Sequence, residues 1–255
     1  MRLRSLLYVP AHSERFVARA YERGADGIIL DLEDSVPEAD KDRARDALID
    51  SARSVGRNGA QVFVRINAGE RQRADAEAAR RAGAALMVAK AGLEALDRLQ
   101  GPLLAMLEDP GAILEARSYA KHPAVIGLCV GSEDLATALG AEPTPEVLRL
   151  PKLLVHYAAK AEGKLSLGLL RSVADYADLA GIEAAAREAR AHGFDGASCI
   201  HPSAVPILNA AFSPRAEEIA WAERVLAAGG EGAFVVDGRM VDAPVIARAK
   251  RILGR

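Results

Sequence analysis

The sequence has few cysteines and almost no net charge, and it lacks a long hydrophobic run. Cys129 and Cys199 lie far apart in apolar stretches, so we expect buried thiols rather than a disulfide or metal site. Lys and Arg number 33 against 35 Asp and Glu, which leaves no field to attract a nucleic acid. The apolar run before Pro10 is too short for a signal peptide or membrane span. We therefore expect a cytoplasmic protein that binds neither nucleic acid nor membrane.

Several motifs of well-known site classes are also missing. No G-x-G-x-x-G follows the first apolar segment, and no Walker pattern is present, which argues against dinucleotide binding and nucleotide hydrolysis. The zinc-type spacings H-x-x-x-H and C-x-x-C are absent too. What the chain does have is 50% hydrophobic residues over a length of 255, enough for a substantial core.

Apolar runs alternate with amphipathic, Ala- and Arg-rich segments along the chain. The runs predict strands at 5–10, 27–33, 61–67, 85–91, 102–108, 125–131, 165–170 and 196–200. The segments between them predict helices, for example at 14–24, 40–53 and 181–193. About eight strand–helix units favour a closed (β/α)8 TIM barrel, with an open doubly wound sheet as the alternative.

The C-terminal segment continues beyond the last predicted strand. It predicts a helix at 213–230, a hairpin at 233–241 with an Asp237-Gly238 turn, and a helix at 243–255. We expect residues 1–212 to form the barrel and residues 213–255 to extend the same domain. Because closing a barrel does not require this extension, we expect it to pack on a neighbouring subunit.

Polar residues follow most of the predicted strands. The carboxyl ends of barrel strands meet at one rim, which carries the active site in this architecture. The residues at these ends are Asp31, Glu33 and Asp34, then Arg65 and Asn67, Lys90, Glu108 and Asp109, and finally Glu133 and Asp134. Taken singly, Asp34, Asp109 and Glu133 are equally consistent with helix caps or first-turn acids.

Glu108 and Asp134 together point to a metal. They follow neighbouring strands, and two carboxylates at one rim repel each other unless a cation lies between them. A few oxygen ligands, with room for water and substrate oxygens, suit Mg²⁺ better than zinc. We expect Arg65 to hold a substrate carboxylate or a developing enolate oxygen, with an ion pair to Glu33 or Asp34 as the alternative. A lone histidine before proline more often caps or packs, so we expect His201 behind the site.

An ordered set of short motifs spans nearly the whole chain. They are R-S-L-L-Y-V-P at 4–10, D-L-E-D-S-V-P at 31–37, K-D-R-A-R at 41–45, V-R-I-N at 64–67, E-D-P-G at 108–111, G-S-E-D-L at 131–135, G-F-D-G at 193–196, I-H-P at 200–202 and D-G-R-M-V-D at 237–242. In this set the chain resembles the citrate lyase beta-chain family, within the HpcH/HpaI aldolase group of Mg²⁺-dependent barrel lyases.

The resemblance implies a reaction and a set of site residues. Family members cleave or form 3-hydroxyacyl thioesters such as citryl-, malyl- or citramalyl-CoA, through an acetyl thioester enolate and a 2-oxo acid. Glu108 and Asp134 would bind Mg²⁺, and Arg65 would hold substrate oxygens beside it. Glu33, Asp34 and Arg4 are further substrate-binding candidates. Asp242 would act as an acid or base in a neighbour's site, or simply cap the helix that follows it, and the assembly would be a homotrimer or hexamer.

The chain departs from the family pattern at several positions. Asp109 stands where Thr is usual, no Lys occurs within 196–199, Ala204 replaces a frequent Gln, and Leu169 and Leu170 occupy a region where an Asp is expected. These departures leave the acyl carrier and the substrate open. Alternatives are an aldolase that releases pyruvate or another 2-oxo acid from a free hydroxy-oxo acid, and a non-catalytic barrel subunit. A basic groove for a 3′-phosphoadenosine, with Arg4, Arg15 and Lys90 as candidates, would favour coenzyme A.

Overall fold

The computed structural model describes residues 3–229 and 232–254. The chain divides into two compact units, one ending at Phe212 and the other beginning at Ser213. Gly230 and Arg255, the last residues of two predicted helices, lie outside the described residues.

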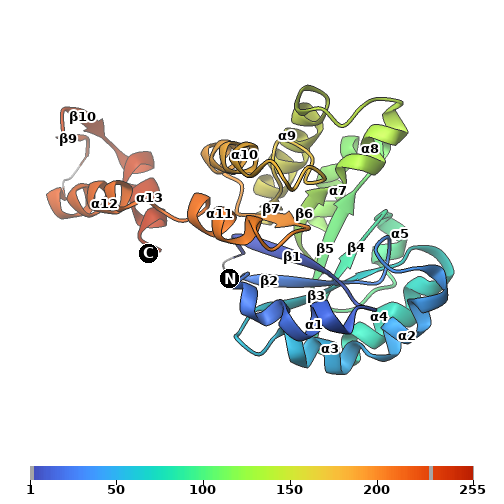
Figure 1. The fold of residues 1–255 in the computed structure, drawn as a ribbon. Coiled ribbons are helices and arrows are strands. Elements are labelled where there is room, and N and C mark those ends of the chain that lie inside the picture. Colours follow the sequence, from blue (N-terminus) through green and yellow to red (C-terminus); the bar gives the residue numbers. More distant parts are fainter. Residues whose placement is uncertain (1–2, 230–231, 255) are drawn as a thin grey trace. The chain divides into compact units, whose positions relative to one another are not determined.

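The first unit is built on eight parallel strands (Figure 1). Their order is β7-β6-β5-β4-β3-β2-β1-β8, and the β7 and β8 edges meet through a Leu167–Gly196 bridge and a 2.9 Å hydrogen bond from Gly168 N to Gly196 O. The predicted (β/α)8 barrel is therefore confirmed. The strands are β1 Ser5–Pro10, β2 Gly27–Asp31, β3 Gln61–Ile66, β4 Ala85–Val88, β5 Leu103–Leu107, β6 Val125–Val130, β7 Leu165–Leu167 and β8 Ala197–Cys199.

Helices cover the outside of the strands. In Figure 1, α1, α3 and α4 lie along β1–β4, and α7, α9 and α10 lie along the other side of the barrel. The helices of this unit are α1 Glu14–Ala20, α2 Lys41–Asp46, α3 Leu48–Val55, α4 Gln72–Arg81, α5 Leu93–Leu96, α6 Pro110–Leu114, α7 Ala116–Lys121, α8 Ser132–Leu139, α9 Pro145–Ala161, α10 Leu179–His192 and α11 Ala204–Ala211, with 3-10 turns at Tyr21–Arg23, Glu38–Asp40 and Gly69–Arg71. The single helix predicted at 40–53 is divided at Ala47 into α2 and α3.

The hydrophobic core has two layers, because successive side chains of a strand point to opposite faces of the sheet. The inner layer fills the barrel with Leu3, Leu6, Ile29, Phe63, Met87, Leu104, Met106, Cys129 and Leu167. The larger outer layer lies between strands and helices and includes Cys199. Both cysteines are free and buried as expected, and burial raises the pKa of each thiol to about 12.

The second unit is the predicted helix–hairpin–helix. It contains α12 Ala216–Ala228, the antiparallel strands β9 Phe234–Val236 and β10 Arg239–Val241, and α13 Ala243–Ile252. The turn residues Asp237 and Gly238 have φ angles of 51° and 72°, as a two-residue hairpin turn requires. The expected contact of this unit with a neighbouring subunit stays a prediction. Within the described ranges, no helix combines the length and apolarity that a membrane span needs.

Candidate functional site

Asp31 and Arg65 form the centre of a polar network at the carboxyl ends of the strands. Asp31 is the last residue of β2, and its Cα lies opposite that of Arg65 in the β2–β3 register. Arg65 donates from Nε to Asp31 Oδ1 at 2.6 Å and from Nη2 to Asp31 Oδ2 at 2.7 Å. Its Nη1 contacts Glu33 Oε2 at 2.9 Å and Asp34 Oδ2 at 3.2 Å. The two-pronged edge of Arg65 is thus occupied by Asp31, and the Nη1 end faces the buried Glu33 and the exposed Asp34.

These contacts stabilise the charged form of Arg65. Burial opposes the charge, but the hydrogen bonds and the attraction of Asp31 outweigh it, so the pKa of Arg65 is raised. The guanidinium also lies over the ring of Tyr8, 5.0 Å from its centroid. The ion pair to Glu33 or Asp34 that the sequence left open is present, and Asp31 is a further partner that the sequence reading missed.

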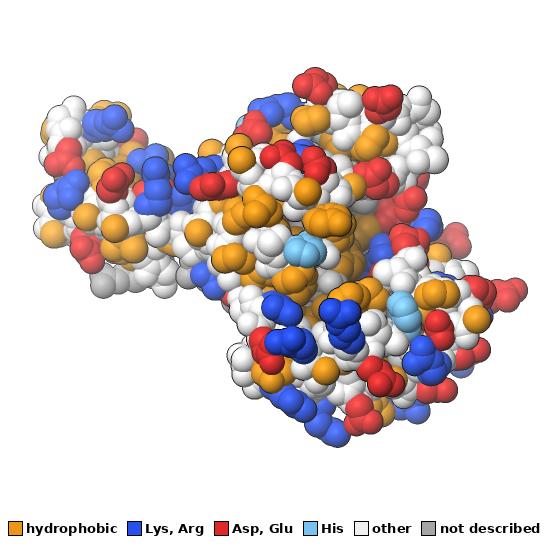
Figure 2. Space-filling view, viewed as in Figure 1, with side chains coloured by type: hydrophobic (Ala, Val, Ile, Leu, Met, Phe, Trp, Pro, Cys, Tyr) orange, Lys and Arg blue, Asp and Glu red, His pale blue; other side chains and the backbone are white. Residues whose placement is uncertain are grey.

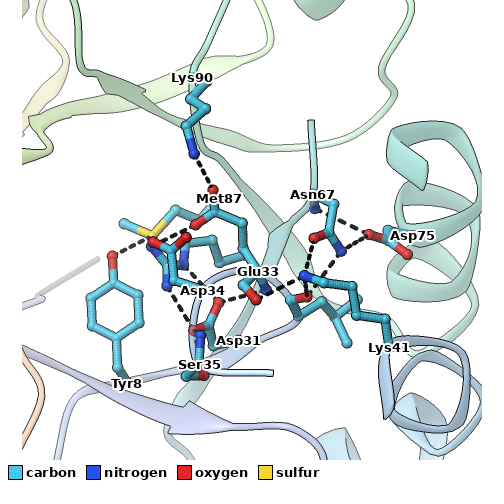
Figure 3. A network of polar contacts seen from close by, with 12 residues as sticks. Tyr8, Asp31, Glu33, Asp34, Ser35, Lys41, Asn67, Asp75, Met87 and Lys90 are labelled. Carbon is cyan, nitrogen blue, oxygen red and sulfur yellow. Dashed lines mark hydrogen bonds and ion pairs between the residues drawn. The ribbon is translucent and has the colours of Figure 1, made fainter. Parts of the chain in front are cut away.

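Hydrogen bonds hold the β2–α2 loop, which carries Glu33 and Asp34, from both β2 and α2 (Figure 3). Asp31 accepts hydrogen bonds from the backbone N and the hydroxyl of Ser35 at 3.2 and 2.5 Å. Lys41 donates to the Glu33 carbonyl at 2.9 Å and to Asn67 Oδ1 at 2.5 Å. Asn67 in turn donates to the buried Asp75 at 2.7 Å. This explains why the loop needs the lysine of its K-D-R-A-R motif.

Glu108 is buried directly after β5, with 6% of its surface exposed. Burial, followed by repulsion from Asp134 and Glu33, raises its pKa to about 8. A Cβ at Gly131 would lie 2.5 Å from Glu108 Cγ, so the G-S-E-D-L motif begins with the residue that leaves room for this carboxylate. The backbone N of Lys90, a non-glycine residue with a φ of 48°, donates to Glu108 Oε2 at 3.2 Å.

Asp134 lies beside Glu108 in the first turn of α8, with its side chain 46% exposed. The negative charge of Asp134 favours the protonated form of Glu108. Lys90 Nζ lies 2.7 Å from Glu33 Oε1 and 3.7 Å from Asp134 Oδ2, and contact with Glu33 raises the lysine pKa. Glu33 itself has a raised pKa because of burial, which Lys90 and Arg65 oppose. The structure therefore brings Glu108, Asp134 and Arg65 into one network.

The donor set of this network fits Mg²⁺ better than zinc. Among the residues that the structure describes, no group of three or more His, Cys, Asp or Glu side chains is arranged to hold a metal. Two carboxylates with an open side match Mg²⁺, which keeps several waters and takes further oxygens from a substrate.

The space-filling view shows the barrel unit hollowed in its middle, with hydrophobic side chains in the hollow and charged side chains along its margins (Figure 2).

One predicted substrate-binding residue, Arg4, lies away from this network. Arg4 precedes β1 and pairs with Asp26, which precedes β2, with Nη2–Oδ1 and Nε–Oδ2 distances of 2.7 Å. It therefore lies at the amino ends of the strands, opposite the rim, and is left out of the proposed site. Asp242 is the N-cap of α13 and accepts a hydrogen bond from Val245 N at 3.3 Å, so the helix-cap interpretation is confirmed and its catalytic role stays a prediction.

Other rim residues have local structural roles. Asp109 caps α6 by accepting a hydrogen bond from Ala112 N at 3.0 Å, and Glu133 is a first-turn acid of α8. These are the helix-cap and first-turn roles that the sequence left open for the two residues. His201 stacks on Tyr176 with ring centroids 5.1 Å apart. Lys152 was missed by the sequence reading: it is buried in α9 and donates to the carbonyls of Leu169 and Arg171 at 2.8 Å, which anchors the β7–α10 loop. The available signal was a lysine among the mostly apolar residues of the segment 147–155.

Comparison with known proteins adds independent evidence. Residues 4–90 and 94–202 match the model of a family described as HpcH/HpaI aldolase/citrate lyase. A citrate lyase subunit beta-like protein of Mycobacterium tuberculosis (strain ATCC 25618 / H37Rv) is 38% identical over 98% of this chain and 94% of its own length. A (3S)-malyl-CoA thioesterase of Cereibacter sphaeroides (strain ATCC 17029 / ATH 2.4.9) is 36% identical, over 99% and 94%.

Solved structures show the same similarity over the full chain. The CitE protein of Mycobacterium tuberculosis in complex with magnesium, acetoacetate and coenzyme A has a TM-score of 0.84 and 34% identity, covering 99% of this chain and 97% of its own. CitE from that organism in complex with magnesium and pyruvate has a TM-score of 0.77 and 29% identity, covering 98% and 99%.

Proposed function

Because this chain belongs to the HpcH/HpaI aldolase/citrate lyase family, we propose that it is a Mg²⁺-dependent carbon–carbon lyase that cleaves or forms a 3-hydroxyacyl-CoA thioester. One observation carries the proposal: a buried Glu108 lies beside Asp134 at the rim, and Lys90 and Glu33 connect this carboxylate pair to Arg65. A barrel that served only as a scaffold would have no use for a carboxylate whose burial is so unfavourable.

Glu108 and Asp134 would hold the cation, and Gly131 would leave the space that Glu108 occupies. When bound, Mg²⁺ supplies a positive charge that stabilises negative charge developing on substrate oxygens. Its binding requires Glu108 to lose its proton, because the carboxylate is the ligand. Complexes of related proteins with magnesium and with acetoacetate or pyruvate support this assignment.

Arg65 would donate from Nη1 to the substrate oxygen on which charge develops as the carbon–carbon bond breaks. Asp34 contacts the same nitrogen in this structure, and its side chain is 64% exposed. The substrate oxygen would therefore displace Asp34 from Arg65, while the buried Asp31 stays in place. Lys90 would balance the charge of Glu33, which remains beside the site.

Asp242 of a neighbouring subunit would exchange a proton at the acetyl carbon, in a homotrimer or a hexamer. This part of the proposal is supported by the resemblance of the D-G-R-M-V-D segment to the corresponding family motif. A carboxylate close to a carbon acid is a suitable acid or base for such a step. The cap that Asp242 provides for α13 uses Oδ1 and is compatible with this second role.

The proposal is tested by product analysis with malyl-, citramalyl- and citryl-CoA in the presence of Mg²⁺. A lyase releases acetyl-CoA together with glyoxylate, pyruvate or oxaloacetate, respectively, in equal amounts. Since similar proteins are named (3S)-malyl-CoA thioesterase, free coenzyme A must be measured in parallel. Malate and free coenzyme A without glyoxylate would show thioester hydrolysis instead. Absence of turnover for all three thioesters would contradict the proposal.

A further inference from the structure

The direction in which Arg65 points is set by one of its three acidic partners. Asp31 takes both Nε and Nη2, whereas Glu33 is shared with Lys90 and Asp34 is exposed. We propose that Asp31 is a positioning residue for the reaction, which holds Arg65 so that Nη1 is the end presented to the substrate. This inference rests on the role of Arg65 in the proposed function.

Asp31 is itself held rigidly. Its side chain is 2% exposed and accepts hydrogen bonds from Glu33 N at 2.9 Å and from Ser35 N and Oγ, in addition to those from Arg65. Burial alone would raise its pKa, but Arg65 and Ser35 more than offset this and the pKa is lowered, so the carboxylate is charged. A charged carboxylate bonded on both oxygens cannot rotate without breaking several hydrogen bonds.

The backbone provides the reference frame for this pair. Asp31 and Arg65 are opposite each other in the β2–β3 register, so the ladder fixes the separation of their Cα atoms. Tyr8 closes one face of the guanidinium at 5.0 Å. Because Asp31 occupies the Nε–Nη2 edge, rotation of the guanidinium plane is blocked, and Nη1 is directed toward Glu33 and Asp34.

Replacing Asp31 by Asn changes the hydrogen bonding to Arg65 while it keeps the shape of the side chain. An asparagine has nearly the same shape but only one acceptor oxygen, and its amide NH₂ would face an N–H of Arg65. Only one of the two parallel hydrogen bonds can then form, so Arg65 loses its fixed orientation although the cavity remains filled. A residue that merely fastens β2 to β3 would affect stability without changing what Arg65 does.

A double-mutant cycle measures this coupling. Binding of pyruvate in the presence of saturating Mg²⁺ is measured by calorimetry for wild type, Asp31→Asn, Arg65→Lys and the double variant. We expect each single variant to weaken binding by about 10-fold or more, as loss of a charge-assisted hydrogen bond does. We expect the double variant to bind no more weakly than Arg65→Lys alone. Asp31 acts by orienting the guanidinium of Arg65, and Arg65→Lys has already removed that guanidinium.

Asp75→Asn is the matched control. Asp75 is also buried and holds the same loop through Asn67, but it accepts hydrogen bonds from Asn67 and Arg45 and not from Arg65. The factors by which Asp75→Asn and Arg65→Lys each weaken pyruvate binding are therefore expected to multiply when the two substitutions are combined. Ser35→Ala is a milder variant that keeps the Asp31 carboxylate and removes one of its hydrogen bonds, and it serves if Asp31→Asn does not fold. Its smaller effect should likewise vanish in the Arg65→Lys background.

Multiplicative effects of Asp31→Asn and Arg65→Lys would overturn the inference. A crystal structure of Asp31→Asn, or of Ser35→Ala, gives a readout that needs no ligand: a displaced guanidinium is expected, and an unmoved one would also overturn it. If wild type neither binds pyruvate nor cleaves a thioester, the proposed function fails. The crystal structure still decides separately whether Asp31 orients Arg65.

Discussion

Replacing Glu108 by Gln is expected to change how the stability of the metal-free protein depends on pH. Burial and two neighbouring acids raise the pKa of Glu108 from 4.5 to about 8. A carboxyl whose pKa is raised on folding contributes stability that is fully present below its unfolded value. This stability is lost as the pH rises through the folded value. The wild-type protein without Mg²⁺ should therefore lose stability between pH 5 and pH 8.

The size of the loss follows from the shift. With pKa values of 4.5 and about 8, linkage gives a loss of about 4 kcal/mol at pH 8 and about 1 kcal/mol at pH 5. Glutamine does not titrate, so the variant should gain about 3 kcal/mol relative to wild type between these two pH values. Any effect of the substitution that does not depend on pH cancels in this difference.

Urea unfolding in EDTA at pH 5, 6, 7 and 8 measures the difference for the two proteins. Asp134→Asn is the matched variant: removing the second-largest cause of the raised pKa should give a smaller change of the same sign. Addition of Mg²⁺ at pH 8 should stabilise wild type and have much less effect on Glu108→Gln. Parallel stability profiles for wild type and Glu108→Gln from pH 5 to pH 8 would refute the reasoning.

Three further predictions concern other parts of the chain. Arg65→Lys keeps the charge but not the paired hydrogen bonds to Asp31, and it should lower thioester turnover about 10²-fold or more. Mg²⁺ binding, measured by calorimetry, should be retained. A loss of stability without a loss of turnover would favour a purely structural ion pair. Co-expression of Asp242→Asn with Glu108→Gln should restore part of the activity that each inactive parent lacks, whereas a monomeric protein or a fully active Asp242→Asn would leave Asp242 as a helix cap. Burial lowers the pKa of Lys152 from 10.5 to about 7, so folding disfavours its charged form and stability should rise from pH 7 to pH 10. Lys152→Met should flatten that rise in denaturant unfolding, and an unchanged slope would contradict it.

Much of the architecture could be predicted because its signals are local. Each barrel strand is a short apolar run ended by polar residues, and the barrel rule then places the ends of β5 and β6 at one rim. The proximity of Glu108 to Asp134 follows from this rule without any knowledge of side-chain geometry. The hairpin at Asp237-Gly238 is equally local, since the dipeptide itself favours positive φ angles.

The partners of Arg65 depended on details that a single sequence does not contain. The second apolar run was expected to continue to Glu33, but β2 ends at Asp31, which lies opposite Arg65 in the β2–β3 register, and Glu33 and Asp34 lie in the loop that follows. Arg4 was a substrate-binding candidate, but it precedes β1, and the orientation of that strand puts it at the end opposite the rim. Lys152 could not be distinguished from a lysine that extends to solvent, because its acceptors are backbone carbonyls of a distant loop.

The rate of thioester cleavage as a function of free Mg²⁺ tests most directly whether the rim carboxylates form a catalytic metal site. It is measured for wild type, Glu108→Gln and Asp109→Asn with the thioester that wild type cleaves fastest. Asparagine also caps helices well, so Asp109→Asn should follow wild type. We expect EDTA to abolish cleavage and Glu108→Gln to need at least about 10-fold more Mg²⁺ for a much lower maximal rate. Full cleavage in saturating EDTA, or an unchanged Mg²⁺ dependence in Glu108→Gln, would contradict the proposed metal site.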